Sequence, residues 1–333
     1  MVQVSEVQVF AGSIRATITY TMKISRRNPR RTLVIVNPVT GEGRAHRAEK
    51  DVASYLALGG EAADFVRSTS PDDVREKAAR ATHDGYTHVV ALGGDGTFHY
   101  VIEGIHGTDA IAGFFPAGGG NDIAAALGIP NDPVLAAEQF VRGRARSIDL
   151  VEARFADGRV AHFIGVGGMG LDAEAAHLAN TRYRAWPGAS RYLAGAFRTF
   201  FREGAFELRA EIDGAPWNGR ALFAAVGNGT SYGAGVKIAP DARVDDGWLD
   251  VAIVADVTLP RLLEALPHAM STGDLCRFPE VQRFRCKSAM LASSRSARVH
   301  GDGEALGSAP VAFTVLPHAV RVVGGRASAA NEK

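Results

Sequence analysis

Short apolar runs alternate with helix-like stretches between residues 33 and 122, and few folds accommodate such a pattern. Helical stretches are expected at about residues 45–58 and from Pro71, where a proline and two acids stand in the first turn. This strand–helix rhythm predicts an α/β domain of three layers, with helices on both faces of a mostly parallel sheet. Four runs have the length and composition of buried strands, at residues 33–36, 63–66, 88–92 and 111–115.

The pattern changes near residue 147. Most later segments have the short form of strands joined by tight turns, such as Asp213-Gly214 and Asp246-Gly247, with a helical insertion at about residues 171–202. We therefore expect the α/β domain to be followed by an antiparallel β-sandwich-like domain. The expected divisions are a flexible basic extension at 1–31, the α/β domain at 32–147, the β-rich domain at 148–315, and a C-terminal tail at 316–333 that returns to the first domain.

Three of the four expected strands run into glycine-rich loops. In an open parallel sheet, ligands bind where loops leave the carboxyl ends of the strands. Glycine lets main-chain N–H groups approach a phosphate closely, and a helix N-terminus behind the loop adds partial positive charge. Three such loops in consecutive units favour a polyphosphate site over three unrelated tight turns. They are residues 37–43 (Asn-Pro-Val-Thr-Gly-Glu-Gly), 93–97 (Gly-Gly-Asp-Gly-Thr) and 116–122 (Pro-Ala-Gly-Gly-Gly-Asn-Asp).

Two of these loops also carry acids. Asp95 and Asp122 would repel a bare polyphosphate, but they are useful if they hold Mg²⁺ that bridges the phosphates. Asp149, at the start of the next strand, is a candidate third member of this set, and a capping or surface role is an equal alternative for it. The loops therefore predict a site for a nucleotide with magnesium.

Two other nucleotide-binding motifs do not account for this chain. No GxxxxGK[ST] segment is present, which excludes a Walker-type site. Residues 165–170 match GxGxxG between a strand and a helix. No strand ending in an acid follows some 20 residues later, however, as ribose recognition would require. Close packing of a helix start against a sheet accounts for these glycines.

Composition and charge limit the partners and the location. The formal net charge of +1 gives no global field that would attract nucleic acid, so no nucleic-acid partner is expected. Cys276 and Cys286 form no CxxC pair, which favours reduced thiols. No apolar run reaches the ~18–20 residues of a spanning helix and no signal peptide is recognisable, so we expect a cytoplasmic protein.

The first 31 residues contain a cluster of basic side chains. Three interpretations stay open: a flexible extension, an electrostatic contact with anionic lipid at the inner face of a membrane, or a segment that precedes a natural start at Met22. The cluster consists of Lys23, Arg26, Arg27, Arg30 and Arg31.

Taken in order, these segments resemble the catalytic domain of the diacylglycerol kinase family, above all its soluble bacterial lipid kinases, which are related to sphingosine and ceramide kinases. The resemblance extends from about Thr32 to Val323. The Gly-Gly-Asp-Gly-Thr segment alone is shared with NAD kinases and, loosely, with phosphofructokinases. Specificity comes from the later segments, which are Asp149-Leu150, Lys237-Ile238-Ala239-Pro240, Asp246-Gly247-Trp248-Leu249-Asp250 and Asp302-Gly303-Glu304.

The resemblance implies an ATP-dependent kinase that phosphorylates a hydroxyl group of diacylglycerol or a related lipid with the help of Mg²⁺. It implies that Asp302-Gly303-Glu304 supplies the general base, as Asp302 or Glu304. It assigns the catalytic metal to Asp95, Asp122 and Asp149, and a second, structural metal, held partly by backbone carbonyls, to Arg243, Asp246 and Trp248. It assigns nucleotide contacts to Asn37, Thr40, Gly41, Ser68, Thr69, Gly93, Gly94, Asp95, Gly96, Thr97, Phe98, His99, Gly118, Gly119 and Asn121. The family's nucleotide-contacting threonine corresponds to Ser68 or Thr69, and the spacing fits Ser68 slightly better.

The chain departs from the family pattern at two places. Gly119 stands where a threonine or serine is usual, and His99-Tyr100 replaces a common Asn-Glu pair. Neither change removes a proposed metal or base carboxylate. A kinase for NAD or another soluble metabolite, and a degenerate regulator that binds nucleotide or lipid without catalysis, remain the alternatives. The identity of the lipid and the oligomeric state, including a homodimer, are left open.

Two interpretations are considered for several apolar side chains of the second domain. They could line a cleft for acyl chains, or they could belong to the core, which is the favoured interpretation. These residues are Phe163, Ile164, Phe197, Phe200 and Phe201.

Overall fold

The computed structural model describes residues 7–11, 14–18, 30–183, 186, 190–233, 235–272 and 278–325. The chain divides into two compact units, at residues 1–30 and 31–333. In the first unit, β1 (Val7–Ala11) and β2 (Ile14–Ile18) form an antiparallel hairpin. Other positions discussed above lie outside the described residues, namely Met22, Lys23, Arg26, Arg27, Cys276 and residues 326–333.

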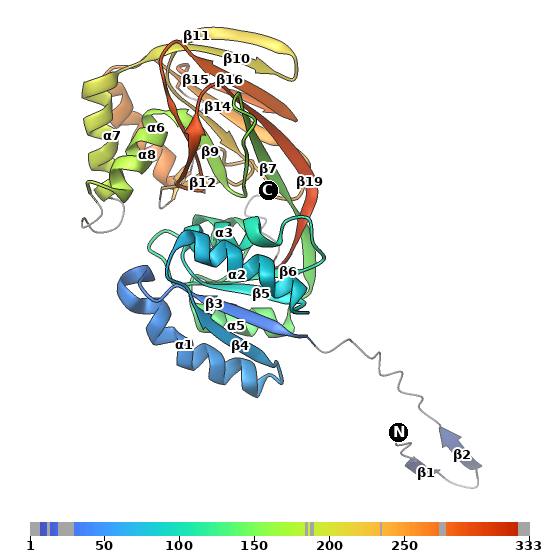
Figure 1. Cartoon of the computed structure of the whole chain (residues 1–333). Coiled ribbons are helices and arrows are strands. Elements are labelled where there is room, and N and C mark those ends of the chain that lie inside the picture. The colour runs from blue at the N-terminus through green and yellow to red at the C-terminus, as the bar shows by residue number, and fades with distance from the viewer. Residues whose placement is uncertain are drawn as a thin grey trace. The chain divides into compact units, whose positions relative to one another are not determined.

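An α/β lobe forms the first half of the second unit (Figure 1). Its sheet has the order β6-β5-β3-β4, with all neighbours parallel, and every residue of β3 and β5 is buried. Helix α2 packs on α3 and α1 on α5. The predicted three-layer α/β domain is confirmed. Its strands are β3 (Thr32–Val36), β4 (Ala63–Arg67), β5 (His88–Gly93) and β6 (Ile111–Pro116), and its helices are α1 (Thr40–Leu58), α2 (Pro71–His83), α3 (Asp95–Ile105), α4 (Asp122–Ala126) and α5 (Pro133–Arg142).

The start of α1 lies before the expected one, although its regular part begins close to the expected residue 45. We expected a helix from about residue 45, whereas α1 begins at Thr40. Its first turn is not regular, because Gly41, Glu42 and Gly43 have φ values of 58°, 56° and 81°. The two glycines adopt this left-handed backbone without steric cost. The regular helix therefore begins after a left-handed turn built from the loop that the sequence had singled out.

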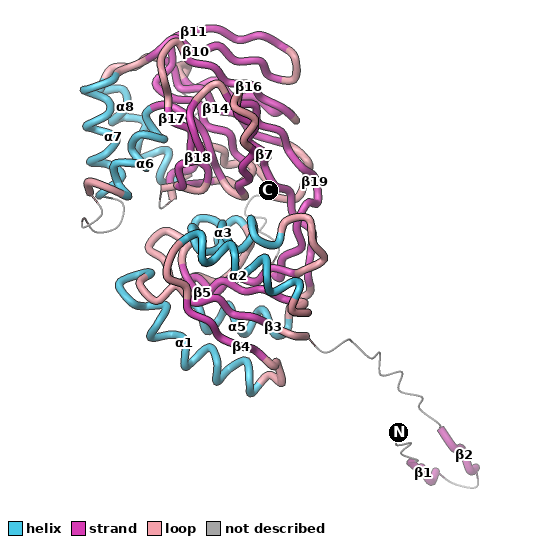
Figure 2. The backbone as a smooth tube through the Cα atoms, viewed as in Figure 1, coloured by secondary structure: helices cyan, strands magenta, loops and turns pink. Residues whose placement is uncertain are grey.

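A β-rich lobe forms the second half of this unit (Figure 2). Its ladders are antiparallel. Buried and exposed residues alternate strictly along β10, as expected for a strand with one face on a core. The predicted β-sandwich-like domain is confirmed. Its strands are β7 (Ala145–Phe155), β8 (Val160–Phe163), β9 (Val166–Gly170), β10 (Phe206–Ile212), β11 (Ala215–Gly227), β12 (Ser231–Tyr232), β13 (Val236–Lys237), β14 (Leu249–Ala255), β15 (Val281–Cys286), β16 (Ser288–Ser293), β17 (Arg298–Gly301), β18 (Glu304–Ser308) and β19 (Val311–Val323).

Three helices gather at one side of the β-rich lobe (Figure 1). The expected insertion contains two of them, α6 (Leu171–Asn180) and α7 (Ser190–Glu203), and α8 (Leu259–Ser271) follows later in the chain. Across the described ranges, no helix combines the length and the apolar character needed to cross a membrane.

Two long strands join the lobes. β7 and β19 pair antiparallel along nearly their whole length, with an irregularity between Leu316 and Val320. The far end of β19 pairs in parallel with β6, where Arg321 lies opposite Ile111. The expected domain divisions at 147/148 and 315/316 fall inside these strands. Residues 316–323, the first part of the expected tail, thus lie beside the α/β sheet.

Candidate active site

The three glycine-rich loops meet at the carboxyl edge of the parallel sheet. A Cβ atom added to Gly41 would lie 2.1 Å from the carbonyl oxygen of Ala117, and one added to Gly118 would lie 2.8 Å from the Cα atom of Gly94. These distances leave no room for a side chain, so the loops touch through bare main chain. The loops that the sequence singled out therefore form one continuous surface.

Asp95 ties two of these loops together. It is the first residue of α3, and its carboxylate accepts the N–H groups of Asp122 and Ile123 at 2.9 and 3.2 Å. Burial, followed by the charges of Asp122 and Asp302, raises the pKa of Asp95 to about 7, although the two N–H donors act in the opposite direction. Acids from three separate turns are thus close enough to interact.

The Asp302-Gly303 turn connects β17 to β18. Both residues have positive φ, 55° and 83°, as expected for a two-residue hairpin turn. The Asp302 carboxylate accepts the N–H groups of Ile164 and Gly165 at 2.9 and 2.7 Å, and its side chain is 1% exposed. The first candidate base is therefore held rigidly by main-chain donors.

Two consecutive side chains of α3 contact the two candidate bases. The Nδ1 atom of His99 lies 3.2 Å from Oδ2 of Asp302, and the Tyr100 hydroxyl donates to Oε2 of Glu304 at 3.0 Å. The other Glu304 oxygen lies 2.7 Å from the position of a Cβ atom on Gly96. The His99-Tyr100 departure from the family pattern is thus adjacent to the carboxylates of the base turn, a contact that sequence reasoning missed.

The charges at this contact affect the helix residues. Burial disfavours the charged form of the His99 imidazole, but the hydrogen bond and charge of Asp302, together with the charges of Glu103 and Glu304, outweigh it and raise the pKa of His99. Burial and the Glu304 charge raise the pKa of Tyr100, so its hydroxyl stays protonated and remains a donor.

Other expected nucleotide contacts lie around the loops. The Asn37 amide donates to the Thr97 hydroxyl at 3.1 Å, and a Cβ atom on Gly94 would lie 3.4 Å from the Thr40 methyl group. Phe98 differs from the expectation, because its side chain is completely buried in the core. Only its main chain can contribute to a nucleotide site.

The residues after β4 separate into a buried and an exposed hydroxyl. Ser68 is buried, and its hydroxyl donates to the carbonyl oxygen of Val36 at 3.1 Å. Thr69 is exposed, and its hydroxyl donates to Asp73 at 3.1 Å. Exposure therefore favours Thr69 as the nucleotide contact, whereas spacing slightly favoured Ser68.

Asn121 shapes the third loop from within. Its side-chain oxygen accepts the N–H of Gly118 at 3.1 Å, and its amide donates to the Gly118 carbonyl at 3.0 Å and to Asn131 at 2.6 Å. The expected nucleotide contact is thus a residue that closes the loop. Gly119 is exposed, and a Cβ atom there would meet nothing within 4 Å, so a hydroxyl side chain would fit at this position.

Asp149 belongs to a different group from the one we expected. We expected it beside Asp95, but its fully buried carboxylate accepts the N–H groups of Gly247 and His318 at 2.7 and 2.8 Å. Main-chain donors of two other segments, the turn at Gly247 and strand β19, therefore use both of its oxygens. The structure groups Asp149 with the proposed second metal site.

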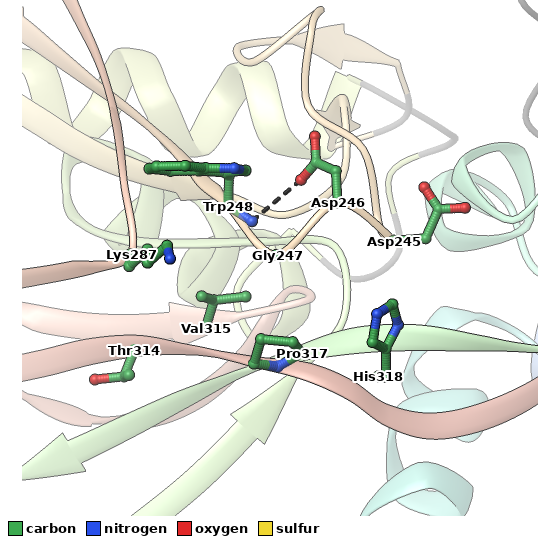
Figure 3. Close-up of a pocket in the computed structure, with 9 residues that line it drawn as sticks. All are labelled: Asp245, Asp246, Gly247, Trp248, Lys287, Thr314, Val315, Pro317 and His318. Atoms are coloured by element: carbon green, nitrogen blue, oxygen red, sulfur yellow. Dashed lines mark hydrogen bonds between the residues drawn. The ribbon is translucent and has the colours of Figure 1, made fainter.

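That second turn borders a pocket of about 480 Å³ (Figure 3). One Asp246 oxygen accepts the N–H of Trp248 at 3.1 Å, and the other accepts a hydrogen bond from Arg285 at 2.5 Å. Burial raises the pKa of Asp246, and the Arg285 charge opposes this. The Arg243 side chain is 70% exposed. A metal ion at this turn would have to compete with Arg285 for the Asp246 carboxylate. The pocket is lined by Asp245, Asp246, Gly247, Trp248, Lys287, Thr314, Val315, Pro317 and His318.

Magnesium fits the first group of acids as an ion shared with phosphates. In the described part of the chain, no three His, Cys, Asp or Glu side chains are grouped so that they could hold a metal ion by themselves. Mg²⁺ usually keeps several waters and binds one or two carboxylates together with substrate phosphates. Asp95 and Asp122 have this character, and a cation would offset the charges of Asp122 and Asp302, which add to burial in raising the pKa of Asp95.

The five apolar side chains expected in a cleft or the core divide between the core and the surface. Phe163 and Ile164 are 1% and 0% exposed, and Phe200 packs against a buried cluster, which is the favoured interpretation. Phe197 and Phe201 differ, because they are 40% and 70% exposed.

Comparison with known proteins agrees with the two-lobed fold. Residues 31–153 match the diacylglycerol kinase catalytic domain, and residues 165–324 match the YegS C-terminal NAD kinase beta sandwich-like domain. Diacylglycerol kinases of Staphylococcus aureus strains MRSA252 and Newman are each 28% identical to this chain over 295 residues, which is 88% of this chain and 92% of the relative.

Solved structures share the fold. A crystal structure of a diacylglycerol kinase from Bacillus anthracis str. Sterne has a TM-score of 0.70 at 19% identity, and covers 90% of this chain and 98% of its own. A second crystal structure from the same strain has a TM-score of 0.76 at 22% identity, with the same coverage. With both lobes matched, residues 31–153 belong to the diacylglycerol kinase catalytic domain family, a family of phosphotransferases, and residues 165–324 belong to the YegS C-terminal NAD kinase beta sandwich-like domain family.

Proposed function

We propose that this protein transfers the terminal phosphoryl group of ATP to a hydroxyl group of diacylglycerol or a related lipid. The main support is that the Asp302–Glu304 turn of the β-rich lobe lies against the N-terminal end of α3, where the phosphates are expected. Glu304 reaches within 2.7 Å of a Cβ position on Gly96. The lipid acceptor is supported by relatives, 28% identical over most of the chain, that are named diacylglycerol kinases.

Phosphoryl transfer depends on positioning and charge neutralisation more than on covalent chemistry. Main-chain N–H groups of the loops and the N-terminus of α3 bind the polyphosphate. Mg²⁺, when bound by Asp95, Asp122 and the phosphates, supplies charge neutralisation. Asp302 or Glu304 takes the proton of the acceptor hydroxyl while the oxygen of that hydroxyl forms the new P–O bond. The bond to the leaving ADP oxygen breaks and its electron pair stays with ADP.

The direct test is transfer of labelled γ-phosphate from ATP. Diacylglycerol, sphingosine, ceramide and NAD are offered separately to the purified chain with Mg²⁺. We expect a labelled lipid product and no labelled NADP. Labelling of NAD alone would establish the metabolite kinase instead, and ATP binding without transfer to any acceptor would establish a regulator.

Variants of the base turn test its role. A positioned base contributes about 10²–10⁴-fold, so we expect Asp302→Asn or Glu304→Gln to lower turnover by such a factor while ATP still binds. Normal turnover in both variants would remove the base assignment.

The chain offers a matched control for Asp302. Asp213 begins a second Asp-Gly turn, has a φ of 45°, and accepts the N–H groups of Lys287 and Ser288 at 3.0 and 2.8 Å. Asp213→Asn therefore changes a turn of the same construction without a contact to the loops. It should cost similar stability and leave turnover unchanged.

A further inference from the structure

Helix α7 carries an apolar stripe that no described core uses. Leu193, Phe197 and Phe201 follow at intervals of four residues, so they share one face, and they are 36%, 40% and 70% exposed. The opposite face is packed. A Cβ atom on Gly195 would lie 2.6 Å from the carbonyl oxygen of Ala175 in α6. The orientation of α7 is therefore fixed by packing, with its large apolar side chains toward solvent.

Positive charge borders this stripe. Arg198 and Arg202 line, together with Phe201, an open pocket of about 440 Å³. The neighbouring acid Glu203 lies 3.6 Å from Arg295, which offsets its charge. Since the chain as a whole has a formal charge of only +1, this is a local feature. Exposed Phe and Leu next to arginine is the composition of helices that lie in the interface of a bilayer.

We propose that α7 docks on a bilayer that contains anionic lipid, with its apolar side chains inserted and its arginines at the headgroups. We call these residues the α7 face: Leu193, Phe197, Arg198, Phe201 and Arg202. The proposal rests on the proposed function in one respect, because a lipid acceptor resides in a membrane.

A bilayer suits the α7 face better than a second copy of the chain does. Trp186, just before α7, is 51% exposed and adds to the three apolar side chains of the stripe. A complete large aromatic side chain has ~150–250 Å² of surface, so the exposed parts of these four side chains together amount to roughly 400 Å². A stable protein interface takes about 800 Å² from each partner. Anionic headgroups also complement the arginines, whereas the same face of a second copy would oppose positive charge with positive charge.

The α7 face is connected to the base turn through a single helix. Asn180, the last residue of α6, donates to the carbonyl oxygen of Gly303 at 3.0 Å. Helix α6 also packs against α7. Docking through α7 would therefore bring α6, whose last residue contacts the base turn, within about one interhelical distance, ~8–10 Å, of the helix that lies on the membrane.

The test measures binding of the full chain to vesicles without nucleotide, so it does not depend on kinase activity. The protein is sedimented with vesicles of phosphatidylcholine alone and with vesicles that also contain ~30% phosphatidylglycerol. The second kind supplies the anionic surface to which basic residues are attracted. We expect the double variant Phe197→Ser/Phe201→Ser to lower binding at least about tenfold, because each phenyl ring loses its burial in the interface. Arg198→Gln/Arg202→Gln should abolish the preference for anionic vesicles, because each arginine near such a surface strengthens binding about fivefold.

A matched control is available on the α/β lobe. Leu58 and Leu135 are 88% and 54% exposed there, so Leu58→Ser/Leu135→Ser removes comparable apolar surface and should not change vesicle binding. Equal loss in this control, or unchanged binding in the Phe197→Ser/Phe201→Ser protein, overturns the proposal.

A second measurement distinguishes membrane docking from two other roles of the α7 face, an acyl cleft and a homodimer interface. With a short-chain, monomeric diacylglycerol, the phenylalanine variant should keep its KM and turnover, while activity on vesicles falls. A raised KM for the short-chain substrate with normal vesicle binding would place these rings in an acyl cleft and overturn docking. A change of molar mass in light scattering between wild type and variant would identify a homodimer interface, with the same consequence.

Discussion

Replacement of Asp95 by asparagine should change how the stability of the protein depends on pH. The Asp95 carboxylate is partly buried and lies near two other acids, which together with burial raises its pKa from 3.8 to about 7. In the folded protein it therefore keeps its proton between about pH 4 and pH 7, whereas the unfolded chain loses it. The wild type should lose stability across this interval as pH rises through the folded-state pKa.

The size of the effect follows from the pKa difference. A shift of about three units corresponds to ~4 kcal/mol, at ~1.4 kcal/mol for each unit. Because Asp95 is partly open to solvent, screening should reduce this to about 2 kcal/mol. Asparagine cannot ionise, so the free energy of unfolding of Asp95→Asn, relative to wild type, should rise by about 2 kcal/mol between pH 4 and pH 8. The amide also faces two N–H donors, which costs ~1–3 kcal/mol independently of pH.

Urea unfolding of both proteins from pH 4 to pH 8, without nucleotide or Mg²⁺, measures this difference. The pH-dependent part is the decisive quantity, because the hydrogen-bond cost is constant. A difference that stays flat within about 0.5 kcal/mol would refute the electrostatic reasoning. Repeating the series with Mg²⁺ and ATP adds a second readout. The wild type should gain stability at pH 8 and the variant should gain much less.

Three other changes follow from the site. The charged pair that His99 forms with Asp302 stabilises the folded state below the unfolded-state pKa of His99, and this stability is lost as pH rises through the raised folded pKa. His99→Gln should therefore destabilise more at pH 6 than at pH 9 in urea unfolding, and an equal cost at both would contradict this. Tyr100→Phe removes the 3.0 Å hydrogen bond to Glu304 and should cost about 1 kcal/mol and several-fold in turnover; wild-type kinetics would speak against a functional contact. Gly119→Thr places a hydroxyl in open space and should lower the KM for ATP up to about tenfold in steady-state assays, whereas a higher KM would show that the hydroxyl obstructs the nucleotide.

The sequence was sufficient for the parallel sheet and for the meeting of its loops. Runs such as residues 33–36 and 89–92 are apolar throughout because both faces of β3 and β5 are covered, as in the central strands of a parallel sheet between helices. Parallel strands also bring their carboxyl ends to one edge, so loops that are far apart in the chain can be placed together without a structure.

Contacts between the lobes could not be inferred in this way. His99 and Asp302 lie 203 residues apart, and no periodicity relates an α3 side chain to a hairpin turn in the other lobe. The hydrogen-bond partners of Asp149 could not be inferred for a related reason. Its position inside β7 is compatible with either of two acid groups, and the structure is needed to show that its carboxylate accepts the N–H groups of Gly247 and His318.

The pairing of β19 in both lobes has a consequence for how the protein is made. This strand pairs with β16 and β7 in one lobe and with β6 in the other, yet it follows every other strand in sequence. During synthesis, the β6 edge of the α/β sheet therefore stays unpaired until residue 321 has been made. Each lobe emerges from the ribosome with an open edge that invites pairing with other nascent chains. Slow translation or a missing last strand should thus expose both halves to aggregation at once.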